Sequence, residues 1–128
     1  MLLKKALIVE DDNRFRALLK RLLEKKFHMI VFEADNGIKG FELFKRESSN
    51  LDILFLDIAM PFMNGIELLE KIREEDKNIP VIIMTCMCDK DSVQRMIELG
   101  VTEYILKTEF VTHLSDRIES ILSTAIRV

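Results

Sequence analysis

The most constraining feature of this sequence is an uninterrupted apolar run, Ile53 to Leu56, that ends in one carboxylate, Asp57. The run lacks the alternation of a half-solvated strand, so it predicts a strand that is buried on both faces, as in parallel sheets covered by helices. Pro61 has no backbone N–H and Gly65 tolerates positive φ, which predicts a loop before the next helical pattern. Asp57 is therefore expected at the carboxyl end of a central strand, where open α/β sheets bind ligands. Taken alone, an aspartate here is also compatible with a solvated strand end or a helix cap.

The composition limits the chain to one domain, residues 1–128, and argues against two classes of partner. With 48% hydrophobic content, 128 residues can fill a single core. Nineteen Lys and Arg against 22 Asp and Glu leave a net charge of −3, which gives no global attraction to nucleic acid or to an anionic membrane. Lys4 and Lys5 interrupt the apolar start, which resembles neither a signal peptide nor a transmembrane span. We expect a cytoplasmic domain that binds neither nucleic acid nor membrane directly.

The two cysteines and the two histidines are not expected to form a site. Cys86 and Cys88 have no histidine near them in the sequence, so reduced, packed thiols are favoured over a zinc site. His28 and His113 lie far from every motif and are interpreted as ordinary surface or boundary residues.

Hydrophobic periodicity divides the chain into alternating strands and helices. The predicted strands are Lys5 to Val9, Met29 to Ala34, Ile53 to Leu56, Val81 to Met84 and Thr102 to Leu106. Apolar residues at helical spacing predict helices around residues 15–23, 38–44, 66–72, 93–97 and 114–125. We expect Asp12 or Asn13 to cap the first helix and Gly100 to end the fourth. The third helix is expected to give way to a polar stretch from Arg73 to Asn78.

Five strands alternating with five helices predict an α/β fold, a doubly wound five-stranded parallel sheet with helices on both faces. The flavodoxin-like strand order 2-1-3-4-5 fits this size, and it makes the first and third strands neighbours at the point where the winding reverses. Glu10, Asp11 and Asp57 should therefore converge there. Thr85 and Lys107 end the fourth and fifth strands and should reach the same crevice.

These five side chains together favour phosphoryl chemistry. Carboxylates that lie close together raise one another's pKa, and a hard cation such as Mg²⁺ relieves the repulsion while binding phosphoryl oxygens. A carboxylate beside Mg²⁺ can attack phosphorus to give an aspartyl phosphate, with Lys107 and Thr85 stabilising the transferred oxygens. Singly, each residue has an ordinary explanation, as a lysine that extends to solvent, a strand-forming threonine or a helix-capping acidic pair.

With these residues the sequence resembles the receiver domain of two-component response regulators over nearly its whole length. The residues that carry the resemblance are Ile8-Val9-Glu10-Asp11-Asp12, Leu56-Asp57-Ile58-Ala59-Met60-Pro61-Phe62-Met63-Asn64-Gly65, Ile83-Met84-Thr85 and Tyr104-Ile105-Leu106-Lys107. The resemblance implies that Asp57 accepts a phosphoryl group from a phosphohistidine of a sensor histidine kinase or a histidine phosphotransfer protein. It also assigns Mg²⁺ to Glu10, Asp11 and Asp57, with help from the Ala59 carbonyl.

The resemblance further implies a conformational switch. Thr85 would move toward the phosphoryl group while Tyr104 moves inward, which would change the surface formed by the fourth helix, the fifth strand and the fifth helix. Such a protein is a self-phosphorylating acceptor with autodephosphorylation rather than a turnover enzyme. It would act as a single-domain regulator or phosphorelay intermediate on a downstream protein that the sequence does not identify, as a monomer or a phosphorylation-dependent dimer. A receiver excised from a longer protein would show the same sequence features.

Three positions depart from the usual receiver pattern. Ala59 and Met87 are apolar near the expected phosphoryl group, and both are expected to slow hydrolysis. Thr108 stands where most receivers have proline, so the Lys107–Thr108 peptide is expected to be trans, because a cis bond before a residue other than proline costs about 2.5–4 kcal/mol. The loop from Thr108 to Thr112 should then be reshaped, with Phe110 as its apolar anchor.

Other function classes fit the sequence less well. A haloacid-dehalogenase-type phosphatase needs a second aspartate two residues after the first, where this chain has Ala59. A flavodoxin-like nucleotide binder needs a phosphate loop rich in glycine and hydroxyl groups, where this chain has the acidic run Glu10 to Asn13. The alternative that stays open is a non-phosphorylated, receiver-like adaptor that binds its partners constitutively.

Overall fold

Within the described residues, 4–86 and 89–125, the computed structural model contains one parallel sheet with the order β2-β1-β3-β4-β5. The side chains of residues 109–113 and 124–125 lie outside this description. The strands are β1 (Lys5–Val9), β2 (Ile30–Ala34), β3 (Ile53–Asp57), β4 (Val81–Thr85) and β5 (Glu103–Leu106). The predicted α/β class and strand order are confirmed.

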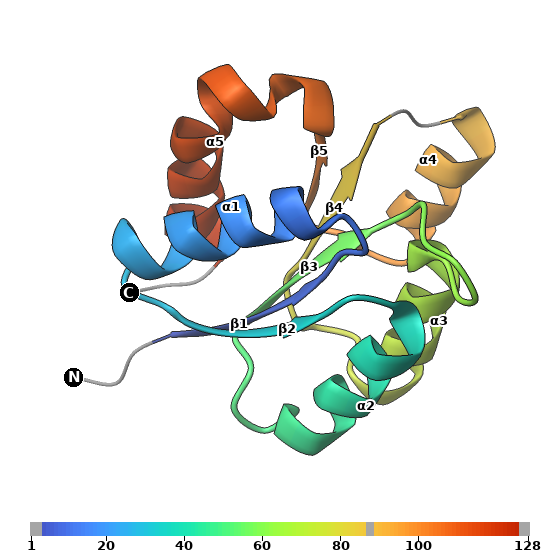
Figure 1. The fold of residues 1–128 in the computed structure, drawn as a ribbon. Helices are drawn as coiled ribbons and strands as arrows, with labels where there is room; N and C mark the ends of the chain where they lie inside the picture. Colours follow the sequence, from blue (N-terminus) through green and yellow to red (C-terminus); the bar gives the residue numbers. More distant parts are fainter. Residues whose placement is uncertain (1–3, 87–88, 126–128) are drawn as a thin grey trace.

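Helices alternate with these strands and cover both faces of the sheet (Figure 1). They are α1 (Asn13–Lys25), α2 (Gly37–Glu47), α3 (Gly65–Glu75), α4 (Lys90–Glu98) and α5 (Phe110–Ala125), the last preceded by a 3₁₀ turn, η1 (Lys107–Glu109). Four helices begin at an Asp or Asn side chain that accepts a backbone N–H of the first turn, namely Asp12, Asn36, Asn64 and Asp89. No helix of the described residues is long and apolar enough to cross a membrane.

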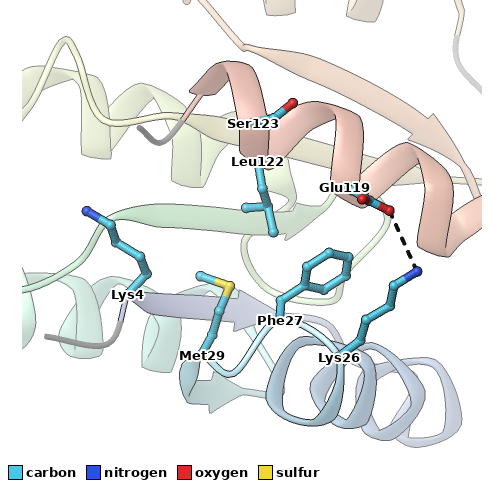
Figure 2. A pocket seen from close by; sticks show the side chains of 7 residues that line it. All are labelled: Lys4, Lys26, Phe27, Met29, Glu119, Leu122 and Ser123. Atoms are coloured by element: carbon cyan, nitrogen blue, oxygen red, sulfur yellow. Dashed lines mark ion pairs between the residues drawn. The ribbon is translucent and has the colours of Figure 1, made fainter. Parts of the chain in front are cut away.

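A cavity of about 330 Å³ opens at the amino ends of β1 and β2, between the ends of α1 and α5 (Figure 2). Met29 and Leu122 lie in its apolar part, beside Phe27, while Lys26 pairs with Glu119 at 3.8 Å. Because the strands are parallel, this cavity lies at the opposite edge of the sheet from Asp57.

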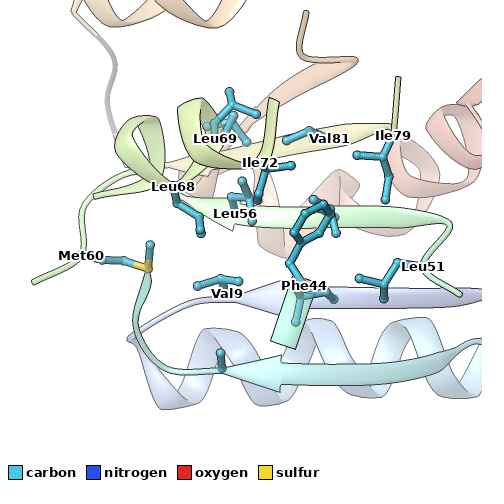
Figure 3. Packing of buried hydrophobic residues seen from close by; sticks show 14 of the residues in the cluster. Val9, Phe44, Leu51, Leu56, Met60, Leu68, Leu69, Ile72, Ile79 and Val81 are labelled. Atoms are coloured by element: carbon cyan, nitrogen blue, oxygen red, sulfur yellow. The ribbon is translucent and has the colours of Figure 1, made fainter. Parts of the chain in front are cut away.

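The central strands divide their side chains between two cores. Ile8 and Phe55 pack with α1 and α5, whereas Val9 and Leu56 pack with α2, α3 and α4, as Figure 3 shows for the second cluster around Phe44. All five residues of β3 are buried. Burial on both faces explains why this segment shows no alternation in the sequence.

The third helix continues where the sequence predicted a polar stretch. Arg73 lies inside α3 and is buried, with its guanidinium donating hydrogen bonds to four backbone carbonyls. These belong to Leu99 (2.7 Å), Ile79 (2.9 Å), Gly100 (3.0 Å) and Asp76 (3.1 Å). Arginine has five N–H donors, so it can be buried where several carbonyls converge. The helix therefore ends at Glu75, three residues later than a polarity argument predicts.

The segment after β5 also differs from the expected loop. The Lys107–Thr108 peptide is trans, as predicted, since the described residues contain no cis peptide bond. However, residues 107–109 form η1 and α5 begins at residue 110, so a continuous helical path replaces the predicted loop. The Phe110 side chain lies outside the described residues, as do Met87 and Cys88. Cys86 is exposed, so its predicted packing in the core is wrong.

Gly65 provides a test of the β3–α3 connection. A Cβ atom at this position would lie 2.1 Å from the Asp57 carbonyl oxygen, whereas Gly100 has φ +68° but open space around it. We expect Gly65→Ala to lower the free energy of unfolding by about 3 kcal/mol or more, because backbone must move. Gly100→Ala should cost about 1–2 kcal/mol, from backbone conformation alone. Urea unfolding of both variants checks this, and a Gly65→Ala protein as stable as Gly100→Ala would contradict it.

Candidate functional site

The carboxyl ends of four strands place the candidate residues around one point. Asp57 and Thr85 are the last residues of β3 and β4, and Glu10 and Lys107 follow β1 and β5 directly. Val9 pairs with Leu56 in the β1–β3 register, so the next residues, Glu10 and Asp57, are neighbours. One oxygen each from Glu10, Asp11 and Asp57 lies within 4.8 Å of the other two. The structure thus brings the three carboxylates together.

One ammonium faces two buried carboxylates in this site. Lys107 Nζ lies 2.6 Å from Glu10 Oε1 and 3.4 Å from Asp57 Oδ2. The Glu10 side chain is fully buried and that of Asp57 is 2% exposed, so their interaction is poorly screened by water. The other oxygen of each carboxylate accepts a hydrogen bond from a backbone N–H group. The Asp12 N–H donates to Glu10 Oε2 (3.1 Å), and the Ala59 N–H donates to Asp57 Oδ1 (3.3 Å). Both carboxylates are therefore fixed in orientation.

The electrostatic balance of the site favours an additional cation. Burial, followed by the neighbouring Glu10 carboxylate, raises the pKa of Asp57 to about 8, and Lys107 only partly offsets this. Burial alone would lower the pKa of Lys107, but its contacts with Glu10 and Asp57 outweigh burial and raise it. One lysine thus does not neutralise three carboxylates, and the ligand set is the all-oxygen type that suits Mg²⁺.

The two residues next to the carboxylates have distinct positions. Asp12 caps α1, because its Oδ1 accepts the N–H groups of Arg14 (2.9 Å) and Phe15 (3.2 Å). Helix capping therefore explains the third acidic residue in the run Glu10-Asp11-Asp12, and no metal contact of Asp12 is needed to explain it. Ala59 is exposed and contributes an N–H to Asp57. Its carbonyl as a metal ligand stays a prediction.

The two residues expected to act as a switch differ in exposure. Thr85 is 2% exposed at the carboxyl end of β4, whereas Tyr104 on β5 is 38% exposed. The β4–β5 register pairs Thr85 with Leu106 and Ile83 with Tyr104, so the two lie on adjacent strands. Their coupling stays a prediction.

Sequence reasoning missed two α1 residues that contact the site. The Phe15 ring centroid lies 4.8 Å from Lys107 Nζ, and Arg16 Nη1 donates to the Glu10 carbonyl at 2.7 Å. Arg16 also pairs with Glu33 at 3.0 Å. The helical spacing marked Phe15 only as a core residue, because its contact with Lys107 depends on how α1 packs on the sheet.

Comparisons with known proteins agree with this geometry. The family model described as response regulator receiver domain matches residues 6–119. A chemotaxis protein CheY homolog of Campylobacter jejuni is 33% identical over 122 residues, covering 94% of this chain and 93% of the relative. Sporulation initiation phosphotransferase F of Bacillus subtilis is also 33% identical, covering 95% of this chain and 96% of the relative. The solved CheX-CheY-BeF3-Mg²⁺ complex from Borrelia burgdorferi is similar with a TM-score of 0.83 and 27% identity, covering 97% of this chain and 90% of that chain.

The raised pKa of Asp57 predicts a pH-dependent loss of stability in metal-free protein. Between its ordinary pKa of 3.8 and its folded pKa of about 8, the folded state binds more protons than the unfolded state. Stability must then fall as the pH rises through this window. Each pKa unit corresponds to about 1.4 kcal/mol. We therefore expect the free energy of unfolding of Asp57→Asn at pH 8 to be at least about 1 kcal/mol higher than that of wild type.

Urea unfolding in a chelator at pH 5 and pH 8 measures this difference. The advantage of Asp57→Asn should grow with pH and shrink when millimolar Mg²⁺ is added. An advantage that is the same at both pH values would show that Asp57 ionises normally.

Proposed function

Because this chain belongs to the response regulator receiver domain family, we propose that Asp57 accepts a phosphoryl group from a phosphohistidine of a sensor histidine kinase or a histidine phosphotransfer protein. The observation that supports this most directly is the buried Asp57 carboxylate, clustered with Glu10 and Asp11 and 3.4 Å from the Lys107 ammonium. Receiver domains are signalling proteins rather than turnover enzymes. The acceptor chemistry should therefore be stoichiometric, one phosphoryl group per chain.

The transfer needs a nucleophile and positive charge. An Asp57 oxygen attacks phosphorus, the P–N bond of the donor breaks, and its electron pair stays on the donor imidazole. Lys107 and the Thr85 hydroxyl stabilise the transferred oxygens. Glu10, Asp11, Asp57 and the Ala59 carbonyl would hold Mg²⁺, which would supply further charge neutralisation. In autodephosphorylation, water attacks phosphorus and releases phosphate and the Asp57 carboxylate.

Phosphorylation would be read at the surface of α4, β5 and α5. The new charge on Asp57 attracts the buried Thr85 hydroxyl, and the exposed Tyr104 side chain moves inward as β4 and β5 adjust. We propose that this receiver domain acts in the cytoplasm on a downstream protein, as a regulator or a phosphorelay intermediate, and as a monomer or a phosphorylation-dependent dimer.

Labelling with a small phosphodonor tests the acceptor assignment. Wild type incubated with Mg²⁺ and ³²P-acetyl phosphate should acquire acid-labile label, and Asp57→Asn should acquire none, because an amide does not attack phosphorus. Asp116→Asn, which changes an exposed aspartate on α5, is the matched control and should label like wild type. Wild-type levels of label on Asp57→Asn would refute the assignment. No label on wild type from acetyl phosphate or from a panel of histidine kinases would favour the constitutive adaptor.

The switch can be followed through one fluorophore. Tyr104 is the only tyrosine and the chain has no tryptophan, so tyrosine emission reports on this residue alone. Beryllofluoride with Mg²⁺ should change the emission in wild type and in Thr85→Ser, which keeps the hydroxyl. Thr85→Ala should accept label from acetyl phosphate yet show little change. An equal change in Thr85→Ala would exclude the coupling.

A further inference from the structure

We propose that Phe15 is a positioning residue for phosphoryl transfer, and that the face of its ring holds the Lys107 ammonium beside Asp57. The inference rests on the proposed function and adds to it a residue that the motifs do not include. Phe15 determines where the ammonium is held, whereas Lys107 itself contacts the reacting group.

The contacts of Lys107 define its position from two sides of the site. On one side, the ammonium lies 2.6 Å from Glu10 Oε1, just after β1, and 3.4 Å from Asp57 Oδ2, at the end of β3. On the other side, it lies 4.8 Å from the centroid of the Phe15 ring on α1. A cation within about 6 Å of a ring is attracted by the negative potential of its face. The Lys107 side chain is only 15% exposed, so water competes weakly for it.

The ring itself is well anchored. Phe15 is half-buried and packs against the core cluster that α1 and α5 form on the sheet, and its N–H is bound by the capping residue Asp12. Its position is therefore set by the first turn of α1. The following residue, Arg16, donates to the Glu10 backbone carbonyl, so the same turn also holds the backbone of one of the acidic residues.

An aromatic face suits a lysine that must change partners. A side-chain oxygen would accept a directional hydrogen bond and compete with the phosphoryl group for the ammonium. The ring attracts positive charge without fixing a donor direction, so the ammonium can turn from the carboxylates to phosphoryl oxygens while staying over it.

The chain offers an internal control at the other end of α1. Phe27 also packs against this core cluster, and Lys26 Nζ lies 5.6 Å from its ring centroid. Figure 2 shows this pair beside the cavity, at the edge of the sheet opposite Asp57. Loss of the Phe27 ring should affect packing to a similar degree but not phosphoryl transfer.

The test replaces Phe15 with 4-fluoro-, 3,5-difluoro- and 3,4,5-trifluorophenylalanine, which progressively weaken the negative face while nearly preserving shape. The initial rate of labelling by acetyl phosphate at saturating Mg²⁺ should fall with each fluorine. Phe15→Leu should label about three- to thirtyfold more slowly, and Phe15→Tyr should label within about twofold of wild type. Phe27→Leu and the fluorinated series at Phe27 should label at the wild-type rate.

Rates that do not follow fluorination, in variants that melt like wild type, would overturn the inference and reduce Phe15 to a packing residue. A wild-type rate in Phe15→Leu would do the same. If wild type itself is not labelled by any donor, the proposed function fails and the role of Phe15 fails with it. If wild type is labelled but the fluorinated series is flat, only the role of Phe15 is lost.

Discussion

The structure depends on the placement of negative charge where two buried strands end side by side. Glu10 and Asp57 are both buried, Asp11 lies at their opening to solvent, and Lys107 is the one ammonium within ion-pairing distance among the described residues. Burial and mutual repulsion raise the pKa of Asp57 to about 8. A site held in this condition responds strongly to an added cation or phosphoryl group, because either one changes a balance that solvent does not screen.

The rest of the fold keeps these charges from moving apart. Two apolar cores fix the central strands from both faces, and α2, α3 and α4 bury one side while α1 and α5 bury the other. At the strand ends, Arg16 binds the Glu10 carbonyl and Gly65 packs directly against the Asp57 backbone. The backbone of these two acidic residues therefore cannot move without disturbing helix packing. In this way apolar burial maintains an electrostatic arrangement that is unfavourable by itself.

Much of this arrangement could be predicted from sequence because it follows from local patterns and chain topology. The buried runs Ile53 to Leu56 and Val81 to Met84 predict covered strands, and right-handed crossovers then bring the ends of β1 and β3 together. Three features could not be predicted in this way. They are the burial of Arg73, the contact between Phe15 and Lys107, and the exposure of Cys86. Each depends on which backbone carbonyl or side chain a neighbouring element brings close, and periodicity carries no such information.

A phosphoryl group on Asp57 would change the competition for Lys107. In the structure the ammonium is divided between Glu10 at 2.6 Å and Asp57 at 3.4 Å, so the shorter contact is with Glu10 and not with the proposed acceptor. A dianionic phosphoryl group would draw the ammonium away from Glu10, whose buried carboxylate would then need another positive partner. The proposed Mg²⁺ meets that need. The proposed acceptor, metal and lysine would thus form one coupled set of charges, and β5, which Lys107 follows directly, would transmit its rearrangement to Tyr104 at the surface.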